Sequence, residues 1–104
     1  LIGCSGGDFR PQIHAEVFTN MADYNMPLNK AVEAPRYVLT SWREKETKAI
    51  VEENVWSHEL PNWAGRIEYQ SPSVGVVQAA RRRPDGMVEL VADPRGGGVA
   101  ASLL

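Results

Sequence analysis

Apolar and polar positions change their period several times along this chain of 104 residues. The run Leu1–Ser5 is typical of the end of a buried strand, and the pair Gly6-Gly7 after it predicts a tight backbone turn. From Pro11 to about Asn25 the period becomes helical. One apolar face of that helix is expected from i, i+4, i+5, i+8 and i+11 spacing, and it comprises Ile13, Val17, Phe18, Met21 and Tyr24.

Residues that favour helix ends delimit two predicted helices. Asp8 is a candidate N-cap, and Pro11 lies in the first turn, where its missing N–H costs nothing. The break at 25–27 separates this helix from a short second helix over Leu28–Ala34. Pro35 ends the second helix, because the residue before a proline is pushed away from helical geometry.

The rest of the chain predicts strands. The clearest signal is a hairpin of two β-rich runs around the turn residues Pro84-Asp85-Gly86, and Asp93-Pro94-Arg95 ends its second strand because proline cannot donate to a ladder. The predicted elements are strands over Tyr37–Trp42, Lys48–Glu53, Arg66–Gln70, Val74–Arg81 and Met87–Ala92, a charged turn over 43–46 and a short helix within Ser57–Trp63. A strand and two helices followed by mainly antiparallel strands is an α+β order, not a regular βαβ repeat.

Composition narrows the class of protein. Hydrophobic residues make up 43% of the chain and charged residues 23%, which fits one globular domain. A net charge of −2 gives no reason to expect nucleic acid or a membrane as a partner. The basic run Arg81-Arg82-Arg83 is interpreted as a solvated hairpin tip. The single cysteine, Cys4, excludes an internal disulfide and leaves the compartment open.

Several side chains are candidates for chemistry. Cys4 and His14 could form a thiol–imidazole pair, but no third group to orient them is identifiable, and Cys4 is interpreted as a small buried residue. His14 and His58 are too few for a metal site, so neither a metal nor a cofactor is expected. The tryptophans are assigned to core or interface packing: Trp42, Trp56 and Trp63. Asp93-Pro94-Arg95 could be catalytic, but the segment is interpreted as a strand-ending turn with a structural ion pair.

Four segments in this order resemble the γ-glutamyltransferase (γ-glutamyltranspeptidase) family. Each segment is weak alone, but together they span nearly the whole chain at compatible spacing. They are Gly3-Cys4-Ser5-Gly6-Gly7-Asp8, similar to G-x-P-G-G-[SD]; Asn20–Tyr24, similar to N-x-x-D-[YF]; Ala31–Arg36, similar to A-V-x-A-P-R; and Asp85-Gly86 with Ala92–Arg95, similar to D-G-x-x-x-x-A-x-D-P-R. Ser5 stands where the family usually has proline, and Arg10 adds a charge near the turn.

The resemblance implies an N-terminal-nucleophile hydrolase with a four-layer αββα sandwich fold. In that family a precursor cleaves itself, and the new N-terminal threonine attacks a γ-glutamyl amide with its own α-amine as the base. The acyl group then passes to water or to an amine. The matched region is roughly the second half of the small subunit, so Leu1 is interpreted as the start of a cut, processed or partial chain. Leu1 cannot be the nucleophile, and the chain alone is expected to be inactive.

The resemblance also implies a role for Gly6 and Gly7. Their backbone N–H groups are candidates for the oxyanion hole, because glycine lets the backbone approach an oxygen closely and the turn leads into a helix N-terminus. The expected partners are the remainder of the precursor and a small γ-glutamyl or related amide, and a homo-oligomer stays open.

A second class of function stays open. The chain could be a non-catalytic α+β interaction module or an acylase-like relative with another amide substrate. A Thr-Thr-His-like start in frame upstream of Leu1 favours the enzyme, whereas a start codon near Leu1 favours the module. A γ-glutamyl peptide, a β-lactam side-chain amide and poly-γ-glutamate all remain open as substrates.

Overall fold

The computed structural model describes residues 1–41, 47–52 and 66–102. These residues form two compact units: Leu1–Ala34 together with Gly75–Leu104, and Pro35–Val74. The elements are β1 (Ile2–Ser5), a 3-10 turn η1 (Gly7–Phe9), α1 (Arg10–Ala22), α2 (Leu28–Glu33), β2 (Tyr37–Ser41), β3 (Lys48–Glu52), β4 (Arg66–Ser71), β5 (Val76–Arg82) and β6 (Val88–Ala92). The α+β class predicted from the sequence is confirmed.

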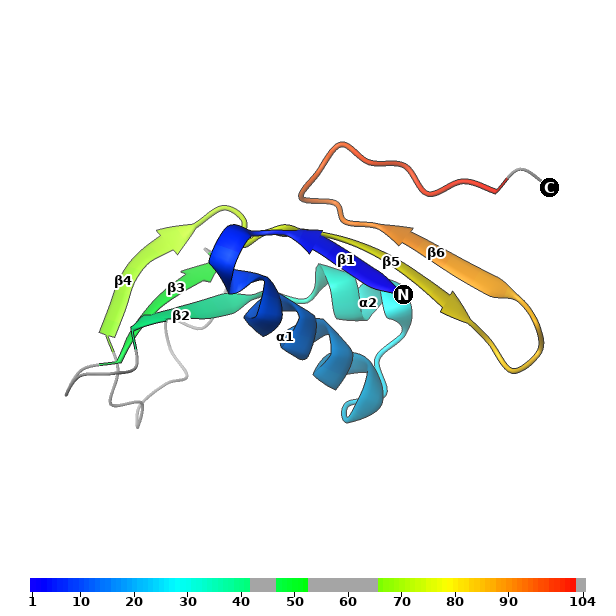
Figure 1. The fold of residues 1–104 in the computed structure, drawn as a ribbon, viewed down its shortest axis with the longest axis horizontal. Helices are drawn as coiled ribbons and strands as arrows, with labels where there is room; N and C mark the ends of the chain where they lie inside the picture. The colour runs from blue at the N-terminus through cyan, green and yellow to red at the C-terminus, as the bar shows by residue number, and fades with distance from the viewer. Residues whose placement is uncertain (42–46, 53–65, 103–104) are drawn as a thin grey trace. The chain divides into compact units, whose positions relative to one another are not determined.

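The first unit is an antiparallel three-stranded sheet in the order β1-β5-β6, with α1 and α2 against one face (Figure 1). Val77 and Ala79 alternate with the exposed Gln78 and are buried on the helix side. The predicted hairpin is confirmed, since Gln78 pairs with Ala92 at one end of the β5–β6 ladder and Arg82 pairs with Val88 at the other. The arginine run 81–83 at its tip is exposed, as predicted.

The start of α1 differs from the prediction. Phe9, not Asp8, is the residue before the helix, and no side chain caps it. Asp8 lies inside the 3-10 turn that precedes α1, so it is one residue too early to cap. Pro11 does lie in the first turn, as predicted. The helix ends at Ala22, before the predicted end near Asn25, and Asn25 adopts a left-handed conformation with φ of 53° in the segment that follows.

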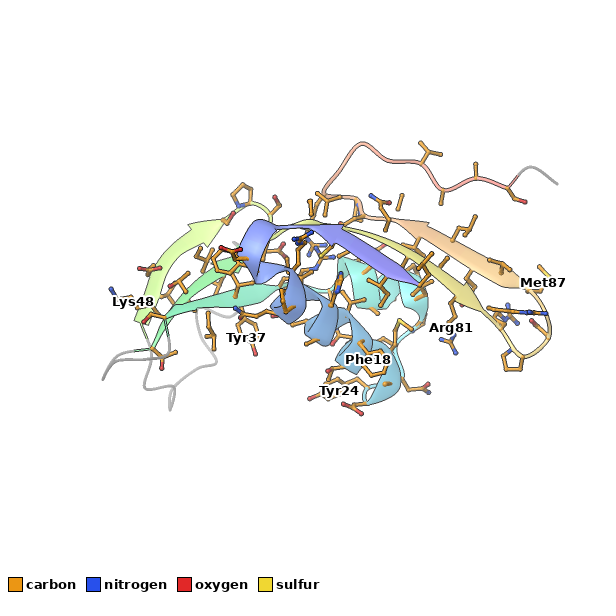
Figure 2. The ribbon with its side chains drawn as sticks, in the orientation of Figure 1. Phe18, Tyr24, Tyr37, Lys48, Arg81 and Met87 are labelled. Atoms are coloured by element: carbon orange, nitrogen blue, oxygen red, sulfur yellow. The ribbon has the colours of Figure 1, made fainter. Side chains whose placement is uncertain are left out.

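The predicted apolar face of α1 is only half correct. Ile13 and Val17 are fully buried, as i, i+4 neighbours on one stripe should be. Phe18 and Tyr24 are 62% and 69% exposed, and both side chains are labelled in Figure 2. Phe18 lies about 100° around the helix from Val17, which takes it off the stripe that meets the sheet. The short helix α2 buries Leu28, Ala31 and Val32 as expected.

The second unit is a three-stranded sheet in the order β2-β3-β4. Strands β2 and β3 are antiparallel, but β3 and β4 are parallel. This parallel pair was not predicted from the sequence, which indicated mainly antiparallel strands. Parallel neighbours need a long connection, and residues 53–65 separate these two strands. The predicted turn over 43–46, the helix within Ser57–Trp63 and the three tryptophans lie outside the described residues.

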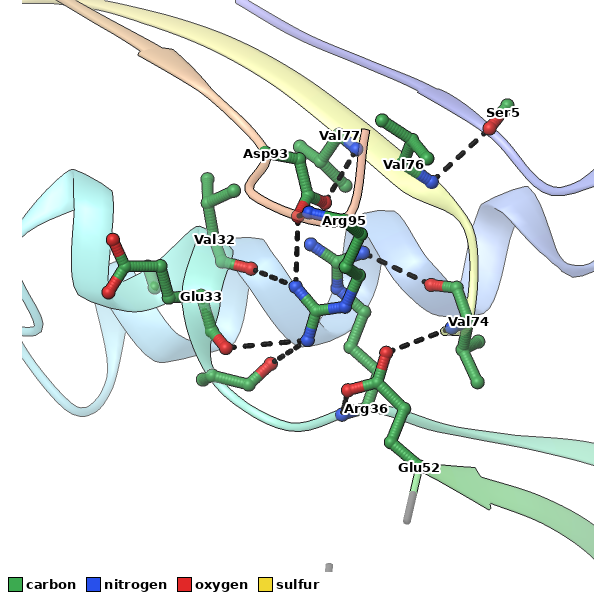
Figure 3. Close-up of polar contacts among 12 residues, drawn as sticks. Ser5, Val32, Glu33, Arg36, Glu52, Val74, Val76, Val77, Asp93 and Arg95 are labelled. Atoms are coloured by element: carbon green, nitrogen blue, oxygen red, sulfur yellow. Dashed lines mark hydrogen bonds and ion pairs between the residues drawn. The ribbon is translucent and has the colours of Figure 1, made fainter. Parts of the chain in front are cut away.

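A buried arginine–glutamate cluster ties the second unit together (Figure 3). Arg36 is 1% exposed, and its backbone N–H donates to Glu52 Oε2 at 3.0 Å. Glu52 Oε1 accepts from the N–H of Val74 at 2.8 Å, and Arg36 Nη1 donates to the Val74 carbonyl at 3.0 Å. Both ends of this unit are thereby joined to β3, so Arg36 of the A-V-E-A-P-R segment has a structural role.

Candidate functional site

The Gly6-Gly7 turn connects β1 to the helical part of the first unit. Gly6 has φ of 141° and Gly7 has φ of 56°, and L side chains rarely adopt either value. A Cβ added at Gly6 would lie 2.7 Å from Ile13 Cδ1, whereas a Cβ at Gly7 would meet nothing within 4 Å. The sequence prediction of a tight turn is confirmed, and Gly7 faces open space.

Two backbone donors are left over at this turn. The carbonyl of Gly6 accepts from Phe9 N–H at 3.1 Å, and the carbonyl of Gly7 accepts from Arg10 N–H. Within residues 1–41, 47–52 and 66–102, no acceptor is bonded to the N–H of Gly6 or Gly7. The first N–H groups of a helical segment have no intrahelical acceptor, so these donors are available to an oxygen from elsewhere. Such donors stabilise negative charge.

Residues 75 and 76, at the start of β5, contact Ser5, the residue before the Gly6-Gly7 turn. Val76 N–H donates to Ser5 Oγ at 3.2 Å, which ties the end of β1 to the start of β5. Gly75, with φ of 67°, passes so close that an added Cβ would lie 2.6 Å from the Ser5 carbonyl oxygen. Ser5 therefore contributes a hydrogen bond where the family pattern has a rigid proline.

Arg10 reaches back to the same turn. Its side-chain Nε donates to the Gly7 carbonyl oxygen at 3.0 Å. Next to this contact lies an open hollow of about 630 Å3, lined by Gly3, Cys4, Gly7, Asp8, Arg10, Pro11 and His14. The charge that departs from the family pattern is thus placed beside the candidate oxyanion donors.

The hollow brings together Cys4 and His14, which lie ten positions apart in the sequence. Cys4 lies on β1 and His14 on α1, and both line the hollow. The Nε2 atom of His14 is buried without a hydrogen-bond partner in the described part of the chain. The i, i+4 spacing of Arg10 and His14 on α1 would have indicated a shared helix face once the helix start was known.

Asp93 and Arg95 form the ion pair that was predicted (Figure 3). Arg95 Nη1 lies 3.1 Å from Asp93 Oδ1 and also donates to the Val32 carbonyl at 3.0 Å. Arg95 Nη2 donates to the carbonyls of Glu33 and Ala34 at 3.3 and 3.0 Å. The pair closes the C-terminal end of α2, where carbonyls lack intrahelical partners, which is a structural role.

The described residues contain neither a candidate metal site nor a membrane-spanning helix. No group of three or more His, Cys, Asp and Glu side chains lies close enough there to hold a metal ion. Among the helices of that same part of the chain, none has the length and apolarity to cross a membrane.

Comparison with known proteins decides the family. The sequence profile of the family described as Gamma-glutamyltranspeptidase matches residues 1–103. The chain belongs to this family. The resemblance inferred from the four segments is thereby confirmed, and the fold is that of the corresponding part of the N-terminal-nucleophile hydrolases.

Two individual relatives of this gamma-glutamyltranspeptidase family member have low sequence identity to it. The Oxamate amidohydrolase proenzyme of Klebsiella pneumoniae is 29% identical over 108 residues, covering 97% of this chain and 20% of the relative. The Glutathione hydrolase-like YwrD proenzyme of Bacillus subtilis is 29% identical over 110 residues, covering 99% of this chain and 21% of the relative. The chain therefore spans about a fifth of the length of these relatives.

A solved structure agrees in fold. The Gamma-glutamyltranspeptidase from Pseudomonas nitroreducens, complexed with L-DON, superposes with a TM-score of 0.82 at 24% identity. The match covers 99% of this chain and 54% of that chain. At this identity the likeness concerns the fold alone.

Proposed function

We propose that this chain is the C-terminal segment of an enzyme that cleaves an amide through an acyl-enzyme, with Gly6 and Gly7 as its oxyanion hole. The observation that carries the proposal is the turn itself. Two adjacent backbone N–H groups have no acceptor in the described residues, at positive-φ glycines beside an open hollow. The turn leads into the 13-residue helix α1, whose N-terminal dipole adds positive potential.

The chemistry follows from where charge develops. An N-terminal threonine outside this chain attacks the amide carbonyl carbon, and its α-amine takes the hydroxyl proton. The carbonyl oxygen becomes an oxyanion, to which the N–H groups of Gly6 and Gly7 donate. Collapse of the tetrahedral intermediate expels the amine, which receives the proton. Water or an acceptor amine then attacks the carbonyl carbon of the acyl-enzyme, and the α-amine takes its proton. The threonine oxygen leaves with that proton, and the acylated product is released.

The substrate and partners follow from the family as part of this proposal. A γ-glutamyl amide is the substrate class that the family name indicates, and the two curated relatives carry glutathione hydrolase-like and oxamate amidohydrolase names. The partner is the remainder of the same precursor, as expected for relatives that are proenzymes. The nucleophile lies in that remainder, so the 104-residue chain alone is inactive. A homo-oligomer of the complete enzyme is part of the same proposal.

A substitution at Gly7 tests the oxyanion hole in the complete enzyme. Gly7→Val projects a side chain into open space at the site, while Gly86→Val imposes a comparable positive-φ strain at the hairpin tip, where an added Cβ also meets nothing within 4 Å. Valine keeps the backbone N–H, but its side chain and the strain at positive φ would block this donor or move it away from the oxyanion. The effective loss of one donor predicts a fall in kcat of about 10²–10³-fold for Gly7→Val, with a smaller change in KM. Gly86→Val should keep kcat.

The measurement is kcat and KM on a γ-glutamyl anilide, with circular dichroism to establish folding and Gly7→Ala as a milder variant. Self-cleavage of the precursor is a second readout, because it also passes through a tetrahedral oxyanion. A folded Gly7→Val enzyme with full kcat would remove the oxyanion-hole assignment. A change confined to KM would mean that the turn binds ground state and transition state alike.

A further inference from the structure

Arg10 lies beside the turn, and the proposed reaction does not use its side chain. A guanidinium carries five N–H donors in a planar fork. In the part of the chain that the structure describes, the polar contact of this side chain is the 3.0 Å hydrogen bond from Nε to the Gly7 carbonyl. Both terminal nitrogens therefore keep their donors, and the positive charge is exposed to solvent.

The Nε contact fixes where those donors lie. Nε is bonded to the carbonyl oxygen of Gly7, the residue whose N–H is a candidate oxyanion donor, so the guanidinium is held next to the proposed oxyanion hole. Gly7 and Arg10 line the same hollow, together with His14 one helical turn further along α1. The Nε2 atom of His14 has no bonded partner among the described residues. The hollow thus combines an anchored cation with a second unused polar group.

We propose that Arg10 binds a carboxylate of the substrate, and that the site selects amides whose carboxylate lies close to the scissile carbonyl. Arginine recognises carboxylates through two parallel hydrogen bonds, and its terminal nitrogens here are the pair that such a contact needs. A carboxylate bonded directly to the scissile carbonyl falls beside the oxyanion, where the fork is anchored. A carboxylate several carbons away has to reach past the turn. This inference rests on the proposed function of Gly6 and Gly7.

Asp8 sets a limit on the strength of this contact. Its carboxylate lines the same hollow and opposes a second anion there. No ion pair joins Asp8 to Arg10 in the described residues, so the aspartate does not occupy the fork. Removing the Asp8 charge should therefore strengthen the preference for a nearby carboxylate, the reverse of removing the Arg10 charge.

The test uses the complete, self-cleaved enzyme and a series of monoamides in which the carboxylate moves away from the amide: oxamate, malonamate, succinamate and glutaramate. Ammonia release gives kcat/KM for each. Arg10→Gln keeps a side-chain donor for the Gly7 carbonyl but removes the charge and the fork. It should lower kcat/KM on oxamate by roughly 10- to 100-fold, the worth of a hydrogen bond to a charged group, and have much less effect on glutaramate. Asp8→Asn should raise the oxamate-to-glutaramate ratio.

The controls separate substrate recognition from a purely structural role. Arg82→Gln removes another exposed arginine charge, from β5, and should leave every ratio unchanged. An equal loss on all four amides in Arg10→Gln would mean that Arg10 only stiffens the turn, and would overturn the inference. So would an enzyme that cleaves a γ-glutamyl anilide but no short monoamide, in which case the proposed function would stand. An enzyme that cleaves none of these amides would remove the proposed function itself.

Discussion

The Asp93–Arg95 pair offers a sharp test of what burial does to an ion pair, because the chain contains a matched exposed pair. Asp93 Oδ1 accepts from the backbone N–H of Arg95, two residues on, and pairs with its guanidinium. Asp85 Oδ1 likewise accepts from the N–H of Met87, two residues on, and Asp85 Oδ2 pairs with Arg83 at 2.6 Å. The side-chain exposure is 0% for Asp93 and 48% for Asp85.

Truncation of each aspartate to alanine should therefore have unequal costs. Asp93→Ala strands the N–H groups of Val77 and Arg95, which donate to the carboxylate at 2.8 and 3.0 Å, and removes the counter-ion of a guanidinium that is 10% exposed. Breaking such a buried pair by removing one partner costs about 3–5 kcal/mol. The partners of Asp85 are already exposed, so in Asp85→Ala they can form hydrogen bonds to water instead. An exposed pair is worth about 0–1 kcal/mol.

The assay is urea unfolding of the complete protein followed by circular dichroism, with midpoints and slopes compared among the wild type and both variants. Asp93→Asn adds a third comparison, because it removes the charge but keeps the side-chain shape and one acceptor oxygen, and it should fall between Asp93→Ala and the wild type. Equal midpoint shifts for Asp93→Ala and Asp85→Ala would refute the reasoning, since the two sites differ chiefly in burial.

Two further predictions concern packing in the first unit. Gly75→Ala should lower the unfolding midpoint more than Gly3→Ala, because the new Cβ at Gly75 meets the Ser5 carbonyl at 2.6 Å while the one at Gly3 meets nothing within 4 Å; similar midpoints in thermal unfolding would contradict the close approach. The isolated 104-residue chain should self-associate, since the face of the β1-β5-β6 sheet away from the helices exposes apolar side chains, with Val88 59% and Leu90 43% exposed. Size-exclusion chromatography with light scattering measures this, and a monodisperse monomer with a sharp two-state melt would favour the self-contained module instead.

The parts of the fold that the sequence predicted correctly are those specified by local signals. The hairpin follows from two β-rich runs around Pro84-Asp85-Gly86, and α2 follows from Pro27 and Pro35 on either side of a short apolar face. Each of these residues restricts the backbone conformation only within a few positions along the chain. The prediction therefore depends little on contacts with distant residues.

The errors lie where distant contacts decide. The parallel pairing of β3 with β4 depends on a long connection that carries no periodic signal. Phe18 fits a helical apolar face in the sequence, but whether it is covered depends on where the sheet meets α1. Asp8 has the right residue type for an N-cap, but the 3-10 turn before α1 moves the helix start past it. None of these three outcomes is specified by the residues adjacent in sequence to β4, Phe18 or Asp8.

The candidate site shows the same division. The glycine pair was identifiable from residue type and from the family pattern, because positive φ is the property that distinguishes glycine. The hollow was not, because Gly3 and Cys4 on β1 and His14 on α1 become neighbours only when the strand and the helix pack. The Ser5–Val76 contact, which holds the turn from behind, joins residues 71 positions apart.

The three arginines near the family segments show how the structure separates recognition from support. Arg36 is 1% exposed and donates to the Val74 carbonyl, and Arg95 directs both terminal nitrogens to carbonyls at the end of α2 and to Asp93. Neither guanidinium can turn to a ligand without leaving buried acceptors unpaired, which costs about 1–3 kcal/mol for each. Arg10 differs, because its Nε is bonded to the Gly7 carbonyl while its terminal nitrogens make no hydrogen bond in the described residues, and the residue lines an open hollow. An anchored cation with unused donors is arranged for binding, so we expect Arg10, and not Arg36 or Arg95, to contribute to the choice of substrate in the complete enzyme.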